Sequence, residues 1–149
     1  MEVFRICREK YAHSLLASGA PNRWNKKDEF VIYTAGNRAL STLEMLVNKS
    51  YINISNQYKL LIILIKDESL IQELKINDLP YNWKANEVYS VLQEIGSKWY
   101  ASKKSLVLKV PSVIVPKEYN FIINTHHPLF TSNISLQSID DFEWDSRLL

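Results

Sequence analysis

Apolar residues in this chain occur in short runs, some of them alternating with polar residues and others continuous. Residues 1–6 alternate, which predicts a first strand. Residues 30–34 are β-branched or aromatic and end at Ala35-Gly36, which predicts a second strand. The most apolar segment, residues 58–67, predicts a strand that is covered on both faces.

Helical spacing appears in three segments. Residues 87–101 predict an amphipathic helix with these apolar positions on one face: Val88, Val91, Leu92, Ile95 and Trp99. A second helix is predicted to follow Asn37, a suitable N-cap, because Leu40, Leu43, Leu46 and Val47 fall at helical intervals. A short helical stretch after the first strand is predicted to place Tyr11, Leu15 and Leu16 on one side.

The second half of the chain predicts further short strands. Three of them, at 105–110, 113–116 and 120–125, are separated by prolines, and 142–145 is predicted as a final edge strand. Segment 67–86 is mixed and polar, so we expect a loop with at most short helical turns. Long βαβ alternation is missing. The pattern therefore predicts an α+β fold of short mixed strands with inserted helices, in one compact domain over 1–149.

Composition narrows the function classes. The 149 residues are 46% hydrophobic and 23% charged, as in ordinary globular proteins, and the net charge is only +2. No run of five Lys or Arg occurs, so we expect no direct nucleic-acid binding. The longest apolar run is too short to span a bilayer, and charges interrupt the start of the chain, so we expect no membrane or signal segment and a cytoplasmic location.

Several common catalytic motifs are missing from the sequence. The single cysteine, Cys7, excludes an internal disulfide and is expected to be a buried apolar residue. The imidazoles of His13, His126 and His127 lie in no metal-binding pattern, so we expect no metal. Neither of the two commonest phosphate-binding glycine loops occurs. Any chemistry therefore depends on other side chains.

Three residues are candidates for a site, each with a structural alternative. Arg23 stands between Asn22 and Trp24, where a guanidinium suits either phosphate recognition or a structural salt bridge. Glu44 borders an apolar helix face, where a carboxylate is either used or ion-paired at the surface. Ser112 lies between Pro111 and a short apolar run, so its hydroxyl is either displayed at a pocket rim or part of an ordinary turn. With Tyr33, they supply an anion binder, a carboxylate, a hydroxyl and an aromatic platform.

Short blocks spread over nearly the whole chain resemble the RES-domain toxins, named for Arg, Glu and Ser, of bacterial toxin–antitoxin pairs with Xre-type antitoxins. The matching blocks run in order at residues 4–6, 22–25, 31–35, 39–46, 96–102, 110–116, 120–124, 127–128 and 142–148. The order of many short blocks makes the resemblance specific. One departure is Pro21-Asn22, where the family usually has glycines; because Asn tolerates positive φ, we expect the turn to survive.

The resemblance implies a fold like that of ADP-ribosyltransferases and NAD as the substrate. It implies cleavage of the nicotinamide–ribose bond by inorganic phosphate, by water or with ADP-ribose transfer. Arg23, Glu44 and Ser112 would be the catalytic residues. Arg23 would hold pyrophosphate or the attacking phosphate, Tyr33 would stack near nicotinamide, and Glu44 would lie near the ribose. Ser112 and Asn124 would complete the NAD-binding pocket, and Trp24 would be a wall that orients Arg23. An Xre-type antitoxin would cover the active site.

Two other functions stay open at this stage. A non-enzymatic module that binds a partner protein would use an exposed surface of Trp83, Trp99 and Tyr100. An RNA-directed toxin would use Lys98, Lys103, Lys104 and nearby aromatic residues, with a salt-dependent affinity.

Overall fold

The computed structural model describes residues 1–149, apart from the side chain of Lys49, and contains one seven-stranded sheet. The spatial order of the strands is β4-β5-β6-β2-β1-β3-β7, and every neighbouring pair is antiparallel except β4 with β5. In chain order the strands are β1 (Glu2–Arg8), β2 (Val31–Ala35), β3 (Tyr58–Ile65), β4 (Ile71–Glu73), β5 (Val107–Pro111), β6 (Tyr119–Asn124) and β7 (Ile134–Phe142). The α-helices are α1 (Arg38–Leu46), α2 (Tyr89–Ser102) and α3 (Phe130–Asn133).

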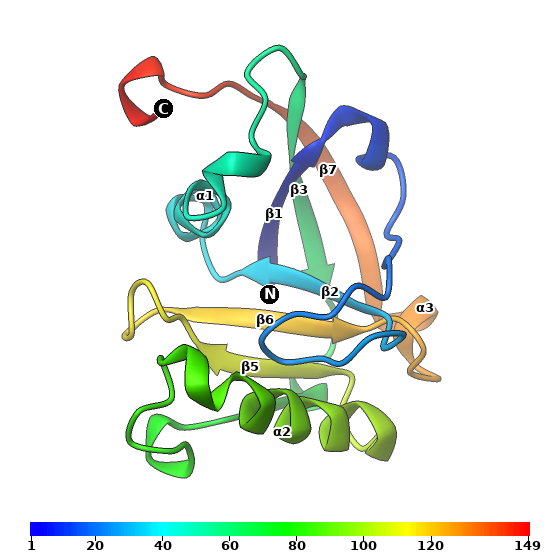
Figure 1. Cartoon of the computed structure of the whole chain (residues 1–149). Coiled ribbons are helices and arrows are strands. Elements are labelled where there is room, and N and C mark those ends of the chain that lie inside the picture. Colours follow the sequence, from blue (N-terminus) through cyan, green and yellow to red (C-terminus); the bar gives the residue numbers. More distant parts are fainter.

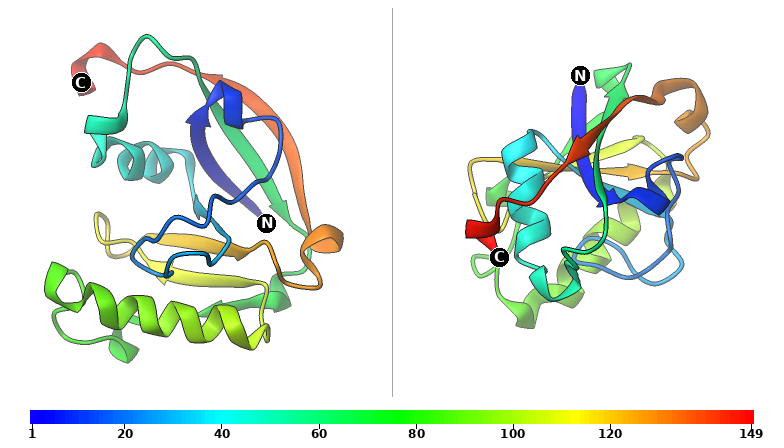
Figure 2. Two further views of the ribbon diagram at one scale, coloured as in Figure 1. Left: turned by 45° about the vertical axis from the view of Figure 1, so that its right-hand side comes forward. Right: turned by 90° about the horizontal axis from the view of Figure 1, so that it is seen from above.

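The sheet has a sharp corner between β1 and β2. These strands pair at a single position, Phe4 with Ala35, whereas β1 pairs with β3 along its whole length. In Figure 1, β1, β3 and β7 stand upright while β2, β6 and β5 run across the view. The view in Figure 2 (left) shows the same two halves from another side. The sheet therefore consists of two half-sheets that meet at one corner.

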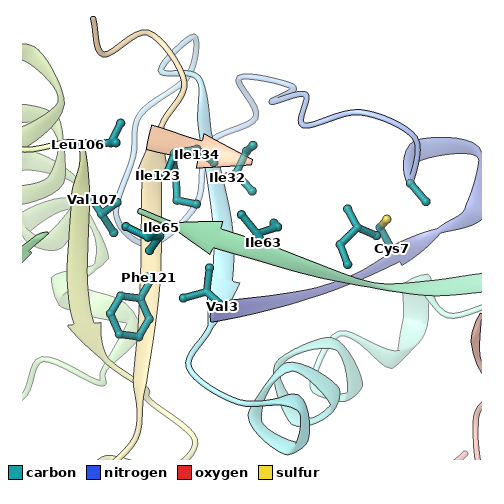
Figure 3. Close-up of a cluster of buried hydrophobic side chains, with 12 residues drawn as sticks. Val3, Cys7, Ile32, Ile63, Ile65, Leu106, Val107, Phe121, Ile123 and Ile134 are labelled. Atoms are coloured by element: carbon teal, nitrogen blue, oxygen red, sulfur yellow. The ribbon is translucent and has the colours of Figure 1, made fainter. Parts of the chain in front are cut away.

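Three clusters of buried side chains stabilise this arrangement. The largest lies at the corner and joins both half-sheets, with Val3 and Ile63 from one half and Ile32, Val107 and Ile123 from the other (Figure 3). Helix α2 covers the other face of β5, β6 and β2 through Leu92 and Trp99. Helix α1 packs against β1. Its Met45 side chain contacts a third cluster, which contains Phe4, Ile6 and Leu60. Apolar side chains thus fix the angle between the half-sheets.

Most of the predicted elements are confirmed. The strands near 1–6, 30–34, 58–67, 105–110 and 120–125 and the helix near 87–101 are present. Helix α1 begins where predicted, because Asn37 Oδ1 accepts the backbone N–H of Leu40 at 2.8 Å. The α+β fold class is confirmed, and Cys7 is buried in the corner cluster. None of the helices in the described residues is long and apolar enough to cross a lipid bilayer.

Four local predictions are wrong. Residues 113–116 form no strand, and the edge strand predicted at 142–145 lies earlier, as β7. Segment 67–86 contains the short strand β4 besides 3-10 turns. After β1 only one 3-10 turn forms, η1 (Glu9–Tyr11), and Tyr11 and Leu16 are exposed. The other 3-10 turns are η2 (Lys49–Tyr51), η3 (Glu68–Leu70), η4 (Ile76–Asp78), η5 (Asn86–Val88) and η6 (Ser146–Leu148).

Helix α2 approaches the loop before β2 so closely that only glycine fits at position 96. A Cβ on Gly96 would lie 1.8 Å from the carbonyl oxygen of Trp24 and 2.6 Å from its carbonyl carbon. Both are backbone atoms, so no side-chain rotation relieves the overlap. Gly96 therefore sets the distance between α2 and the segment that contains Arg23.

We predict that Gly96→Ala destabilises the protein, although alanine is favoured over glycine by about 1 kcal/mol inside helices. Overpacking against a backbone costs about 1–3 kcal/mol, so the free energy of unfolding should fall. Denaturant unfolding measures this change. Lys98→Ala, on the exposed side of the same helix, should stay within about 0.5 kcal/mol of the wild type. A Gly96→Ala variant as stable as the wild type would contradict the predicted overlap.

Candidate functional site

The separation of β1 from β2 beyond their single pair opens a cleft with two adjoining lobes. One lobe has a volume of about 230 Å³ and is lined by Arg5 of β1 and Thr34 of β2. The other has a volume of about 420 Å³ and is lined by Arg23 and Tyr89. Both lobes share five lining residues: Asn22, Tyr33, Glu44, Asn48 and Asn120. The shared wall makes the two lobes parts of one cleft.

The carboxylate of Glu44, on α1, is held at the junction of the lobes. The Ser112 hydroxyl donates to Glu44 Oε1 at 2.8 Å, and Asn120 Nδ2 donates to the same oxygen at 2.5 Å. Ser112 Oγ also accepts the backbone N–H groups of Ile114 and Val115, so its proton is directed to Glu44. Among the described residues, no group donates to Oε2. One oxygen of Glu44 is therefore fixed, and the other is available to a ligand.

The structure brings Arg23 to the same cleft, but its aromatic partner is not the one predicted. The guanidinium carbon lies 5.1 Å from the ring centroid of Tyr89, at the start of α2. Trp24, expected as the wall beside Arg23, belongs to the apolar cluster under α2 and also lines this lobe. Arg23 and Trp24 form a tight turn between the paired residues Asn22 and Asn25. The ring that faces the guanidinium comes instead from α2.

The loop that holds Arg23 is fixed by side chains of β2 and α2. The Tyr33 hydroxyl donates to Asn25 Oδ1 at 2.7 Å and accepts the Trp24 N–H at 3.1 Å. Gln93 Nε2 donates to the carbonyl oxygens of Asn22 and Asn25. Burial raises the pKa of the Tyr33 phenol, so it stays protonated and keeps donating. Tyr33 thus anchors the loop, besides lining both lobes.

Sequence reasoning missed several polar residues of this cleft, among them Arg5 and Asn120. Arg5 lies in the apolar strand β1, and burial lowers its pKa from the usual value for arginine. Its guanidinium has one long contact, at 3.5 Å, to the carbonyl oxygen of Leu16. A charge inside an apolar strand was the signal that could have identified it. Asn120, which holds Glu44, differs from other polar strand residues in no way that the sequence reveals.

Asn124, predicted to take part in NAD binding, lines neither lobe of the cleft. It is fully buried, donates to the carbonyl oxygen of Tyr100 and accepts the N–H of His126. Asn120 and Asn124 lie four residues apart on β6, roughly 13 Å at the rise of a strand. Only the first of them reaches Glu44. His127 is also buried, and its ring forms hydrogen bonds with backbone groups of Lys103 and Leu129.

Two polar atoms of the cleft are buried without a hydrogen-bond partner in the described residues. They are Arg23 Nη1, a donor, and Asn120 Oδ1, an acceptor. Buried polar groups are nearly always paired, and an unpaired one costs about 1–3 kcal/mol. A ligand with both acceptors and donors would satisfy them. Since the charged lining residues are two guanidiniums and one carboxylate, the cleft favours an anionic ligand.

A bent mixed sheet with a carboxylate and two arginines at its corner defines a cleft suited to binding an anionic ligand. Comparison with known proteins identifies the family: the RES domain model matches residues 2–145, so the chain belongs to the RES domain family. It is 33% identical over 152 residues to "Toxin Res" of Yersinia enterocolitica, covering 99% of each chain. It is 35% identical over 153 residues to "Toxin Res" of Photorhabdus laumondii, covering 100% of this chain and 97% of the relative.

A third relative has a more specific name. The "Prs ADP-ribosylating toxin" of Sphingobium sp. is 32% identical over 143 residues, which cover 93% of this chain and 88% of the relative. The fold is thus that of the RES domain family and resembles ADP-ribosyltransferases, as the sequence predicted.

We predict that Tyr33 makes stability depend on alkaline pH. Its folded pKa is raised by burial, so the unfolded chain releases this proton first, near pH 10. Stability should therefore be fully present below pH 10 and fall above it. Tyr33→Phe should reduce the slope by up to about 1.4 kcal/mol per pH unit in unfolding measurements between pH 9 and 11. An unchanged slope in Tyr33→Phe would contradict the burial effect, and Tyr81→Phe, at an exposed ring, is the matched substitution for comparison.

Proposed function

We propose that this protein is a toxin that cleaves the nicotinamide–ribose bond of NAD. The observation that carries the proposal is Glu44, held through one oxygen at the junction of two lobes that each contain an arginine. The names of the relatives, two of them Toxin Res and one an ADP-ribosylating toxin, support the toxin function and the class of substrate.

The reaction needs a fixed negative charge beside the ribose. When the bond between C1′ and the pyridinium nitrogen breaks, its electron pair goes to nitrogen, and nicotinamide leaves as a neutral molecule. Positive charge then develops on the ribose, as in other glycosidic cleavages. Glu44 Oε2 would stabilise that charge and accept a ribose hydroxyl. Because the leaving group becomes neutral, no general acid is required, which fits a cleft without a histidine in its lining.

The two arginines would bind the phosphates of NAD. Arg23 has an unpartnered buried donor and rests on the Tyr89 ring, so a pyrophosphate oxygen would satisfy Nη1 without reorganising the loop. Arg5 would hold a second anion in the smaller lobe, either the other phosphate of NAD or an attacking inorganic phosphate. Tyr33 lines both lobes and would pack near the nicotinamide end. Ser112, which is fully buried, would act by holding Glu44 rather than by touching NAD. No metal takes part in this proposal.

The acceptor of the ribosyl group has three candidates. An oxygen of inorganic phosphate, of water or of an acceptor molecule would form the new bond to C1′, and the hydroxyl proton of that acceptor would leave to solvent. The name of the Sphingobium relative favours ADP-ribosyl transfer, and Arg5 as a second anion site favours phosphate. Products formed from NAD with and without inorganic phosphate distinguish phosphorolysis from hydrolysis and from transfer.

A non-enzymatic partner-binding module is less well supported. The surface proposed for it does not exist, because Trp83 and Trp99 are each only 4% exposed and belong to the cluster under α2. The tryptophans fill the core, as the helical spacing of Trp99 had indicated.

We predict that the purified protein releases nicotinamide from NAD and that Glu44→Gln lowers kcat by about 10²–10³-fold. The substitution keeps the shape of Glu44 and removes its charge. Arg23→Ala should raise KM, because it removes a phosphate contact. Chromatography of nicotinamide measures both, and growth after expression of each variant reports toxicity. Glu143→Gln, on the exposed tail after β7, is the matched control and should behave as the wild type. Full NAD cleavage by Glu44→Gln would refute the mechanism, and no cleavage by the wild type would refute the function.

We also propose that an Xre-type antitoxin covers the cleft. Bound over both lobes, it would prevent NAD from reaching Glu44. Purified antitoxin should therefore stop nicotinamide release and slow amide hydrogen exchange in residues 22–25 and 112–120. A stable complex that still cleaves NAD at the wild-type rate would show that the antitoxin binds elsewhere.

A further inference from the structure

Asn120 occupies a rigid position in the middle of the sheet. It is the second residue of β6, and it lies in register with Ala35 of β2 on one side and Val110 of β5 on the other. Backbone hydrogen bonds on both sides fix its Cα and hence the direction of its side chain. An amide on such a strand can hold a partner in place, because its own position varies little.

The amide helps to fix the orientation of the Glu44 carboxylate. Asn120 Nδ2 and the Ser112 hydroxyl both donate to Oε1, so a rotation that tilts the carboxylate away from this orientation would weaken two hydrogen bonds at once. Glu44 itself stands on α1, which packs against β1 of one half-sheet and also contacts β2 of the other. The hydrogen bond from Asn120 therefore joins this helix to a further strand, β6, across the cleft.

We propose that Asn120 is a positioning residue for NAD cleavage, which acts by fixing the carboxylate of Glu44 beside the ribose. This inference rests on the proposed function. Ser112 can share the task but cannot replace Asn120, because a single donor leaves the carboxylate free to swing about that one bond. Without the amide, Glu44 would occupy several orientations, only some of which place Oε2 near C1′. Loss of Asn120 Oδ1 would remove at most one neutral hydrogen bond to NAD, whereas the charged contacts of the arginines would stay.

Kinetics of Asn120 variants test this role. Asn120→Ala should lower kcat for nicotinamide release by about 10²-fold, since small misplacements of a catalytic group have effects of that order. KM should stay within about threefold of the wild type. The double variant Asn120→Ala/Ser112→Ala should fall to the level of Glu44→Gln. Asn124→Ala is the matched control: it removes a buried asparagine from the same strand outside the cleft and should keep the wild-type kcat at a temperature where all variants are folded.

Asn120→Asp provides a second test with a side chain of the same shape. Its pH dependence distinguishes a positioning role from a merely structural one. It puts a carboxylate against Glu44, and two such groups share a proton as the pH falls. The other charged or titratable side chains around Glu44 are Arg5 of β1, Arg23 of the loop, Tyr33 of β2 and Tyr89 of α2. Asn120→Asp should be least active at neutral pH and should recover relative to the wild type toward pH 5, where the shared proton restores the donor.

The outcomes separate this inference from the proposed function. Cleavage of NAD by the wild type, with kcat lowered and KM kept in Asn120→Ala, supports both. If the wild type cleaves NAD and Asn120→Ala has the wild-type kcat, or Asn120→Asp shows no recovery at low pH, only the role of Asn120 is refuted. If the wild type releases no nicotinamide, the proposed function is refuted first.

Discussion

The parting of β1 from β2 is the constraint on which the site depends. Paired strands lie about 4.8 Å apart, a spacing that leaves no room for a ligand between them. Here β1 pairs with β3 and β2 pairs with β6, whereas β1 and β2 pair with each other only at Phe4 and Ala35. The apolar cluster at the corner holds the half-sheets at this angle. The cleft is therefore a consequence of core packing rather than of a flexible loop.

The polar groups of the cleft are each held by an element other than their own. Glu44 comes from α1 and is fixed by Ser112 and Asn120, while Arg23 comes from a loop and rests on Tyr89 of α2. Such cross-links keep the charges in place before a ligand arrives, so little reorganisation is needed during a reaction. The same arrangement accounts for the two unpaired atoms among the described residues. Each side chain is held by other contacts, which leaves Arg23 Nη1 and Asn120 Oδ1 available to a ligand.

The sequence predicted the fold class, most elements and the meeting of Arg23, Tyr33, Glu44 and Ser112, since periodicity and family blocks carry that information. It did not predict contacts set by the crossing of distant elements. Alternation places Asn120 and Asn124 on the same face of β6, but only the path of α1 decides which one meets Glu44. Residues 113–116 have strand composition, yet the Ser112 hydroxyl accepts the N–H groups of Ile114 and Val115 and turns the chain. The catalytic roles of the four residues named first stay predictions.

The departure from the family at Pro21-Asn22 has a physical explanation that differs from the one expected. The left-handed residues around this loop are Gly19 and Asp28, whereas Asn22 does not adopt positive φ. Instead, Asn22 Oδ1 accepts the N–H of Arg23 at 2.8 Å and the hydroxyl of Tyr89 at 2.9 Å. A glycine has no side-chain acceptor, so the asparagine side chain here joins the loop to Tyr89, whose ring lies against the guanidinium. In this chain, the hydrogen bond between Asn22 and Tyr89 therefore helps to orient Arg23, a task that a glycine turn would perform through its backbone conformation.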